Sequence, residues 1–188
     1  MSLIVRNREG HIQFEVEDVS CLNDLDLRCA DFSGQDLEGV QLSGSDLRDA
    51  DFSGAEMYWA SAFEAIFDGA HLCSARLDGA NLKSASFRGA DMRKAYISSD
   101  NLGAAPSLSG ADLTGALLDG AVLTGCEYDD ATRFPDGFDP VARGMTWVDQ
   151  NRIYVRPGSF ATKDLAPGFY VPDPEHPGSY IPIPDKNK

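Results

Sequence analysis

Large apolar residues recur at every fifth position through most of the chain. Two positions before most of these centres stands a small residue, usually alanine, and the residue between them is often Asp or Asn. Ala62 interrupts the series, because a small residue stands there at the position of a centre. The centres are Leu22, Leu27, Phe32, Leu37, Leu42, Leu47, Phe52, Met57, Phe67, Leu72, Leu77, Leu82, Phe87, Met92, Ile97 and Leu102, then, after one inserted residue, Leu108, Leu113, Leu118, Leu123 and Tyr128.

A period of five residues fits neither an α-helix nor a flat strand. A helix would spread the centres around its circumference, and a flat strand would point successive centres to opposite faces. A five-residue period is explained if the chain turns a corner after each centre. The centre and the small residue two positions earlier then face inward, and the residue between them faces outward. Four such sides would close a coil of about 20 residues, and stacked coils would pair like parallel strands. The pattern therefore predicts an all-β solenoid.

Several segments match one repeat signature directly, among them Ala80-Asn81-Leu82-Lys83-Ser84, Ala90-Asp91-Met92 and Ala111-Asp112-Leu113. Over residues 20–131 the chain resembles the pentapeptide-repeat family, whose signature is A-[DN]-L-x-x. The resemblance implies a right-handed quadrilateral parallel β-helix, which at about 20 residues per coil would have about five to six coils. The periodicity alone predicts a stacked coil and leaves its hand open.

The two ends of a stacked coil expose apolar surface and unpaired backbone, so caps are expected. Residues 1–19 are predicted to form an N-terminal cap, with short strands at residues 3–5 and 12–16 and a hairpin turn at residues 7–10. Residues 132–149 are predicted to form a C-terminal cap with one helical turn. In that turn Asp139 would be the N-cap and Gly144 the C-terminal stop.

The last segment, residues 150–188, is rich in Pro and Tyr, so long helices are excluded there. We expect an extended tail, partly disordered beyond about residue 172. Two interpretations are open for its role. The tail packs along a face of the solenoid, or it is an arm that binds a partner.

Charge narrows the possible partners. The chain has 16 basic and 30 acidic residues, a net charge of −14. Such a surface repels nucleic acid and anionic lipid and suits a basic protein partner, although the acid can equally serve solubility alone. No apolar stretch approaches the roughly 18 residues of a membrane-spanning helix, and the N-terminus does not resemble a signal peptide. These features favour a cytoplasmic protein, either a monomer or a homodimer.

Candidate chemistry is sparse. The three histidines, His11, His71 and His176, fall in the N-terminal cap, in an outward repeat position and in the tail. The four cysteines have no zinc-site spacing, and no motif of a hydrolase, metalloprotease or nucleotide-binding site occurs. The many outward Asp residues are expected to bond exposed backbone near the corners. We therefore expect no catalytic residues, no metal and no cofactor.

Two departures from the repeat are the candidate interaction sites. Around Ala62, apolar and aromatic residues replace the usual polar ones, and the four-sided stacking brings Tyr96 to the same side as Tyr58. The candidates are Tyr58, Trp59, Phe63, Ile66 and Tyr96. Coverage of these side chains by the tail or the cap is the alternative. The second departure is the insertion corner, expected to bulge outward by one residue, at Gly103, Ala104, Ala105, Pro106 and Ser107. A local bulge without function is the alternative for this corner.

Three functions fit these features. The first is a non-enzymatic protein-interaction module or scaffold. The second, implied by the resemblance, is an acidic DNA-mimic inhibitor of a type II topoisomerase, as in fluoroquinolone resistance. Residues 25–128 carry 16 acidic and 7 basic residues, a net charge of −9, which favours it. The single inserted residue and the Pro-rich tail count against it. The third is an immunity or regulatory protein that sequesters one partner through Trp59 and Phe63.

Overall fold

The computed structural model describes residues 3–7, 9–16, 20–100 and 103–149, together with strand residues 153–154, 169–172 and 180–182. The chain forms two compact units, Met1–Val148 and Asp149–Lys188. The first unit contains β1 (Leu3–Asn7), β2 (Ile12–Val16), β3 (Ala30–Asp31), β4 (Glu127–Tyr128) and β5 (Thr146–Trp147). The second contains β6 (Ile153–Tyr154), β7 (Phe169–Pro172) and β8 (Tyr180–Pro182).

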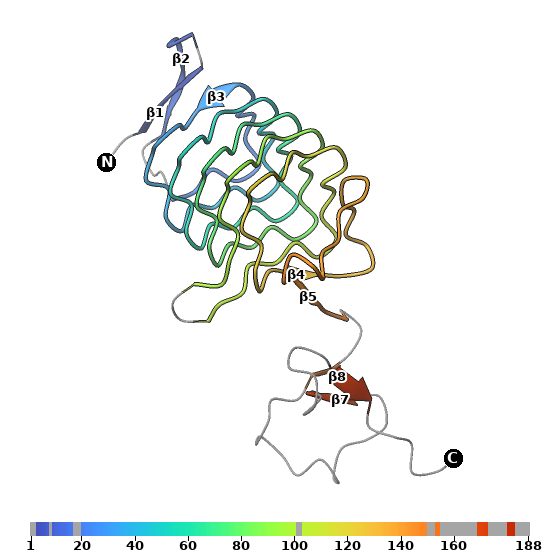
Figure 1. Cartoon of the computed structure of the whole chain (residues 1–188). Coiled ribbons are helices and arrows are strands. Elements are labelled where there is room, and N and C mark those ends of the chain that lie inside the picture. Colours follow the sequence, from blue (N-terminus) through green and yellow to red (C-terminus); the bar gives the residue numbers. More distant parts are fainter. Residues whose placement is uncertain are drawn as a thin grey trace. The chain divides into compact units, whose positions relative to one another are not determined.

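The body of the first unit is a stack of four-sided coils whose sides pair in parallel (Figure 1). From Cys21 to Arg76 each outward residue forms a parallel bridge with the residue 20 positions further along, as Cys21 does with Gln41. Side 1 runs through Cys21, Gln41, Ser61, Asn81, Ser107 and Glu127, side 2 through Asp26, Asp46, Ile66, Ser86, Asp112 and Arg133, side 3 through Asp31, Asp51, His71, Asp91 and Leu117, and side 4 through Asp36, Glu56, Arg76, Tyr96 and Val122. The five-residue period thus becomes one side per repeat.

The interior of the stack is filled by the apolar centres and the alanines beside them. From residue 22 to residue 97 every centre is at most 3% exposed, and so is Ala62. Phenylalanine rings stack between coils at centroid distances of 4.9 Å, in the pairs Phe32–Phe52 and Phe67–Phe87. Burying each large side chain contributes about 1.5–3 kcal/mol. The core therefore holds the coils in register.

Corners are formed by tight turns with a repeated backbone conformation. The carbonyl of most centres accepts a hydrogen bond from the amide three residues later, as Leu27 O does from Ala30 N at 3.1 Å. The residue two positions after a centre has a positive φ, the angle that a type II turn requires at its third residue. Glycine occupies this place at Gly34, where φ is 64°. The corner position therefore favours small or turn-forming residues.

The insertion is longer than the sequence pattern predicted. Arg76 pairs with Tyr96 at the usual separation of 20 residues, whereas Tyr96 pairs with Val122 and Asn81 pairs with Ser107 at a separation of 26. Six residues are therefore added between side 4 and side 1, and the expectation of one inserted residue was wrong. The chain on either side of the added residues departs from the stack and forms a projecting loop, yellow-green in Figure 1.

The N-terminal end of the stack is capped by the hairpin of β1 and β2. These strands pair antiparallel, with a register shift between Val5 and Arg6. β1 also pairs antiparallel with β3, through Arg6 with Asp31 and Asn7 with Ala30. The Asn7 side chain accepts hydrogen bonds from the amide of His11 at 2.9 Å and from that of Glu9 at 3.1 Å. The hairpin thus satisfies backbone groups of the first coil.

The C-terminal end is capped by a single turn and by β5, which pairs in parallel with β4. Asp139 Oδ1 accepts hydrogen bonds from the amides of Val141 and Ala142, each at 3.0 Å. Gly144, with a φ of 72°, ends the turn, and the amide of Met145 bonds Pro140 O at 3.0 Å. These are the cap and stop roles predicted for this segment, in a turn too short to be assigned as a helix.

In the second unit, β6 pairs in parallel with β7, and β7 pairs antiparallel with β8. Extended backbone is therefore present in the segment predicted to be an extended tail. His176 and most of residues 150–188 lie outside the described residues, so the two interpretations of the tail stay predictions. Among the described residues, no helix has the length and apolar character to cross a membrane.

Candidate functional site

A cleft of about 590 Å³ opens where side 4 turns toward side 1, at the base of the projecting loop. It is lined by Glu38, Tyr58, Trp59, Arg76, Asp78, Ser98, Ser99 and Asp100. Tyr58 and Trp59 of the aromatic departure therefore meet the start of the insertion, where Asp100 lies 41 residues after Trp59 in sequence. We name this feature the Trp59 cleft.

Trp59 occupies a corner position in a conformation that bulky residues rarely adopt. Its φ is 54°, and its side chain is 44% exposed. The indole lies across Gly79 in the next coil, where a Cβ atom would stand only 2.6 Å from Trp59 Cδ1. The indole Nε1 donates a hydrogen bond of 2.5 Å to Asp100 Oδ2. The backbone conformation of Trp59, its contact with Gly79 and its hydrogen bond to Asp100 thus fix the position of the ring.

Asp100 connects Trp59 to the projecting loop. Its Oδ1 accepts a hydrogen bond of 2.7 Å from the amide of Ala104, and its own amide donates to Ala104 O at 3.0 Å. The amide of Gly103 in turn donates to Asp100 O at 3.1 Å. The loop is therefore closed on itself at its base, and the same carboxylate orients the indole.

The floor of the cleft is an arginine held between two tyrosines. The Arg76 guanidinium lies 5.1 Å from the ring centroid of Tyr58 and 4.8 Å from that of Tyr96. Its Nε donates to Asp78 Oδ2 at 3.1 Å, and Ser98 Oγ donates to Asp78 Oδ1 at 2.5 Å. Burial alone would lower the pKa of Arg76, but the bond to Asp78 raises it above its ordinary value. The guanidinium therefore stays charged.

The structure separates the five aromatic and apolar candidates. Tyr58 and Trp59 line the cleft, and Tyr96 contacts Arg76, which also lines it. Phe63, 40% exposed, follows Ala62 at the corner between sides 1 and 2, and Ile66 lies half-buried on side 2. Trp59 and Phe63 therefore do not line one cleft.

The insertion-corner candidates also divide. Gly103 and Ala104 bond Asp100, whereas Pro106 and Ser107 are buried where side 1 resumes. Ala105 lines a shallow depression of about 230 Å³ that is also lined by Lys83.

Sequence reasoning did not single out Glu38, Arg76, Asp78 or Asp100. Arg76 carried a usable signal, because it fills an outward slot usually taken by Asp or Asn and stands 20 positions before Tyr96.

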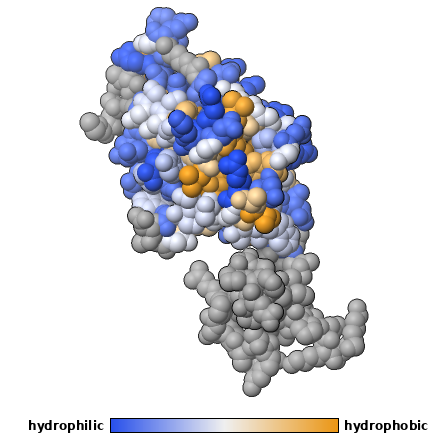
Figure 2. Space-filling view, viewed as in Figure 1, coloured by the Kyte–Doolittle hydropathy of each residue, from blue (hydrophilic) through white to orange (hydrophobic). Residues whose placement is uncertain are grey.

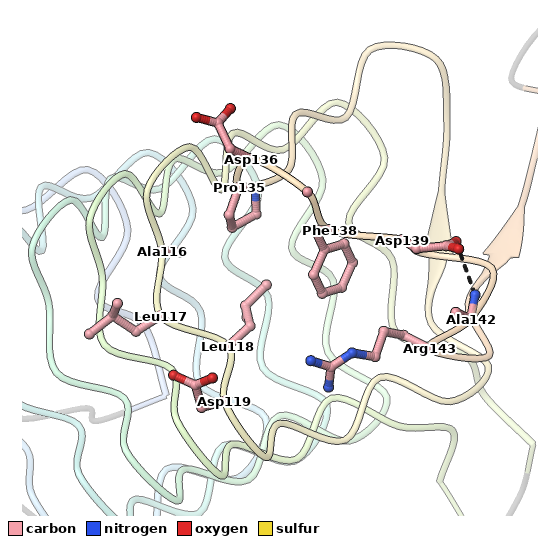
Figure 3. Close-up of a pocket in the computed structure, with 11 residues that line it drawn as sticks. Ala116, Leu117, Leu118, Asp119, Pro135, Asp136, Phe138, Asp139, Ala142 and Arg143 are labelled. Atoms are coloured by element: carbon pink, nitrogen blue, oxygen red, sulfur yellow. Dashed lines mark hydrogen bonds between the residues drawn. The ribbon is translucent and has the colours of Figure 1, made fainter.

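A second depression, of about 380 Å³, lies where the C-terminal cap meets the last coils (Figure 3). Leu118, Phe138 and Arg143 line it, and the Arg143 guanidinium lies 5.5 Å from the Phe138 ring centroid. The groups here are already used in packing the cap and in closing its turn, as the Asp139 bonds show. We interpret this depression as the boundary at which the C-terminal cap packs against the last coils, and not as a binding site.

Charge is unevenly distributed around the stack. Along side 2 each of four carboxylates faces an arginine, in the pairs Asp26–Arg28, Asp46–Arg48, Asp68–Arg88 and Asp112–Arg133. The side-chain hydrogen bond from Arg28 lowers the pKa of Asp26 to about 2. Because side 2 is locally balanced, the net negative charge of the solenoid resides mainly on the other sides. In the part of the chain that the structure describes, no group of three or more His, Cys, Asp or Glu residues could hold a metal ion.

Apolar surface is also grouped. Figure 2 shows one face of the molecule, where hydrophobic residues form a band among hydrophilic ones. The most exposed large apolar side chains of the solenoid include Trp59, Phe63, Tyr96 and Leu117, each at least 40% exposed. Of these, Trp59 lines the cleft of about 590 Å³ and Leu117 lines the depression at the C-terminal cap, and each also contains charged side chains.

The model of the pentapeptide repeats matches the chain in eight copies, over residues 26–61, 65–99 and 107–127. The chain belongs to the pentapeptide-repeat family. Members of this family fold as right-handed quadrilateral β-helices. No curated protein matches the chain significantly.

Several solved structures are similar to this pentapeptide-repeat protein. A pentapeptide repeat protein of the Arabidopsis thaliana thylakoid lumen is 33% identical over 58% of this chain and 68% of its own, with a TM-score of 0.40. One from Nostoc is 28% identical over 61% of this chain and 85% of its own, with a TM-score of 0.35. A trypsin-treated form of QnrB1, a plasmid-mediated fluoroquinolone resistance protein, is 26% identical over 69% of this chain and 65% of its own, with a TM-score of 0.33.

Proposed function

We propose that this pentapeptide-repeat protein is a non-enzymatic interaction module that binds a protein partner through the Trp59 cleft. The observation that carries this proposal is the exposed side chain of Trp59, which is fixed by its hydrogen bond to Asp100. Tryptophan is also enriched among the residues that dominate binding energy at protein interfaces.

The rest of the solenoid supports a surface function. Its described centres from Leu22 to Leu123 and the alanines beside them are buried, which leaves the faces and ends for recognition. A rigid β-stack loses little conformational entropy when a partner binds its surface, which favours affinity. The Trp59 ring, the Arg76 stack and the loop base are already fixed by hydrogen bonds and ring contacts. The cleft is therefore preorganised.

We infer further that the stack is right-handed, as in the rest of the family, and has about five to six coils of about 20 residues. The period of the parallel bridges supports the coil length.

Comparing partner capture by three forms of the tagged full chain tests the proposal. The wild type is compared with Trp59→Asn, because Asn tolerates a positive φ better than most residues. Phe63→Ser is the matched control, since Phe63 is similarly exposed but lies at another corner. We expect Trp59→Asn to lose a partner that the wild type and Phe63→Ser retain. Identical capture by all three forms would reject the cleft as the binding surface, and loss with Phe63→Ser alone would move it to the next corner.

The length of the projecting loop favours a second candidate, an acidic DNA-mimic inhibitor of a type II topoisomerase. The single inserted residue counted against this candidate, and the six residues that the structure adds there remove that objection. The net charge of −9 over residues 25–128 is also consistent with entry into a basic DNA gate. Adding the protein to a DNA gyrase supercoiling assay tests this candidate. Absence of inhibition at micromolar concentration would exclude it.

A further inference from the structure

We infer that side 1 of the solenoid is the face through which this chain binds a second copy of itself. The outward row of side 1 does not line the Trp59 cleft, so this surface is additional to the one in the proposed function. Three features carry the inference. The row is uncharged between Cys21 and Ser107, exposed aromatic residues stand at both of its edges, and the chain as a whole is strongly acidic.

The outward row of side 1 differs from the other three rows in its charge. Its residues are Cys21, Gln41, Ser61, Asn81 and Ser107, and an acidic residue first occurs at the end of the row, at Glu127. Each of the other sides begins with two acidic residues, which are Asp26 and Asp46 on side 2, Asp31 and Asp51 on side 3, and Asp36 and Glu56 on side 4. In the coils that the structure describes, side 1 is therefore a long uncharged row on a chain with a net charge of −14.

The edges of this row are aromatic. Trp59 stands two positions before Ser61 and Phe63 stands two positions after it, and their side chains are 44% and 40% exposed. Charged residues such as Glu64 follow at the corner, where they are exposed. Protein interfaces have this composition, because charged residues are depleted from their centre, aromatic residues are enriched there and the rim is polar. Side 1 is therefore suited to contact with another protein surface.

The charge of the chain favours a second copy as the occupant of this face. Two copies with a net charge of −14 repel each other, so their contact is least costly where no carboxylates are brought together. The side chains of Gln41, Ser61 and Asn81 each donate and accept hydrogen bonds, so the same row on a second copy satisfies them. A basic partner would gain more from the acidic row of side 3. The contact therefore places side 1 against side 1 around a two-fold axis.

The backbone of side 1 is suited to packing face to face. Parallel bridges join Cys21, Gln41, Ser61 and Asn81 in an unbroken ladder, and such ladders pack against each other about 10 Å apart. Ser107 is 6% exposed, so the accessible part of the row ends at Asn81. One side of the coil is smaller than a standard protein interface. We therefore expect a dimer that dissociates on dilution.

Sedimentation equilibrium of the full chain, at concentrations up to about 1 mM, measures this self-association. Ser61→Glu places a carboxylate in the middle of the row, and we expect it to raise the dissociation constant of the dimer roughly ten-fold or more. Ser53→Glu is the matched control, because Ser53 is also half-buried but lies at the corner between sides 3 and 4. It should leave the dissociation constant within about two-fold of the wild type. Gln41→Glu, which keeps the size of the side chain, should weaken the dimer even if Ser61→Glu fails to fold.

The salt dependence of the dimer is a second measurement. Because the contact is uncharged and the two copies repel each other, raising the salt concentration from about 50 mM to about 500 mM should strengthen the dimer. A monomer at every concentration, a dimer that salt weakens, or equal effects of the substitutions at Ser53 and on the side 1 row would overturn the inference. Since Ser61 does not line the Trp59 cleft, each of these outcomes leaves the proposed function standing.

Discussion

Trp59 Nε1 and Asp100 Oδ2 are 2.5 Å apart in space and 41 residues apart in sequence. This hydrogen bond joins the corner at which the repeat turns aromatic to the loop at which the repeat is interrupted. A break in a solenoid costs backbone pairing, and a tryptophan with positive φ costs conformational energy, so each feature alone would be a defect. Their contact makes them one structure, in which the loop base holds the indole and the indole covers the loop base.

Removing the Asp100 carboxylate should release both the Trp59 indole and the base of the projecting loop. We predict that Asp100→Ala lowers the free energy of unfolding by about 1–3 kcal/mol, because the amide of Ala104 and the indole of Trp59 lose their acceptor. Limited proteolysis should cut faster between residues 98 and 106, and the Trp59 fluorescence should shift to the red. Asp119→Ala, which removes an exposed carboxylate elsewhere, is the control. Unchanged proteolysis would mean that the loop is held by other contacts.

The close contact between the Trp59 indole and Gly79 can be tested by substituting two comparable glycines. Gly79 and Gly89 have φ angles of 69° and 65°, but an added Cβ would meet Trp59 at 2.6 Å only at Gly79. Gly89→Ala should therefore cost about 1–2 kcal/mol of unfolding free energy for the backbone alone, and Gly79→Ala about 1–3 kcal/mol more for the clash. Chemical denaturation measures both. In a Trp59→Gly background the difference between the two substitutions should vanish, and its persistence would contradict the contact.

Most of the architecture follows from the local pattern, because the five-residue period determines which side chains face inward. The centres from Leu22 to Ile97 are buried as their phase implies. The insertion was misjudged because residue 102 is a leucine in the correct phase, and a local pattern cannot show with which earlier side the chain resumes pairing. That information lies in the bridges of Asn81 with Ser107 and Tyr96 with Val122.

The candidate site was predicted only in part, for the same physical reason. Tyr58, Trp59 and Tyr96 were conspicuous as aromatic residues in polar slots. The role of Asp100 depends on the path of the loop, and that of Asp78 on burial beneath Arg76, neither of which a repeat pattern encodes. The stacking of Arg76 between Tyr58 and Tyr96 depends on the pairing between coils, which fixes which outward residues become neighbours.

The division between core and surface predicts opposite outcomes for two phenylalanines four positions apart. Phe67 is fully buried and contacts Phe52 and Phe87, whereas Phe63 is 40% exposed. Phe67→Ala should lower the free energy of unfolding by about 3–5 kcal/mol through the cavity it leaves. Phe63→Ala should change it by about 0.5 kcal/mol or less. Urea titrations of the two variants measure the difference, and similar losses would contradict the assignment of Phe63 to the surface.

The paired carboxylates predict how stability depends on pH. Burial alone would raise the pKa of Asp68, but hydrogen bonds from Arg88 and Ser86 bring it below its ordinary value. The bond from Arg48 lowers the pKa of Asp46, and that from Arg28 lowers the pKa of Asp26 from 3.8 to about 2. Because these pKa values are lower in the folded state, the unfolded chain takes up protons first as the pH falls. The stabilisation is therefore complete above about pH 4 and is lost progressively toward pH 2.

Removing one arginine should make this pH dependence shallower. In Arg88→Gln, Asp68 loses the two guanidinium hydrogen bonds to its Oδ2, its pKa rises toward that of the unfolded chain, and its share of the acid destabilisation shrinks. The measurement is the free energy of unfolding from urea titrations between pH 5 and pH 2, at low and high salt. Lys94→Gln, which removes an exposed cation from another corner, should keep the wild-type slope. If both variants follow the wild-type curve, the Asp68–Arg88 pair contributes nothing to acid stability, and the paired charges of side 2 serve only to balance its surface.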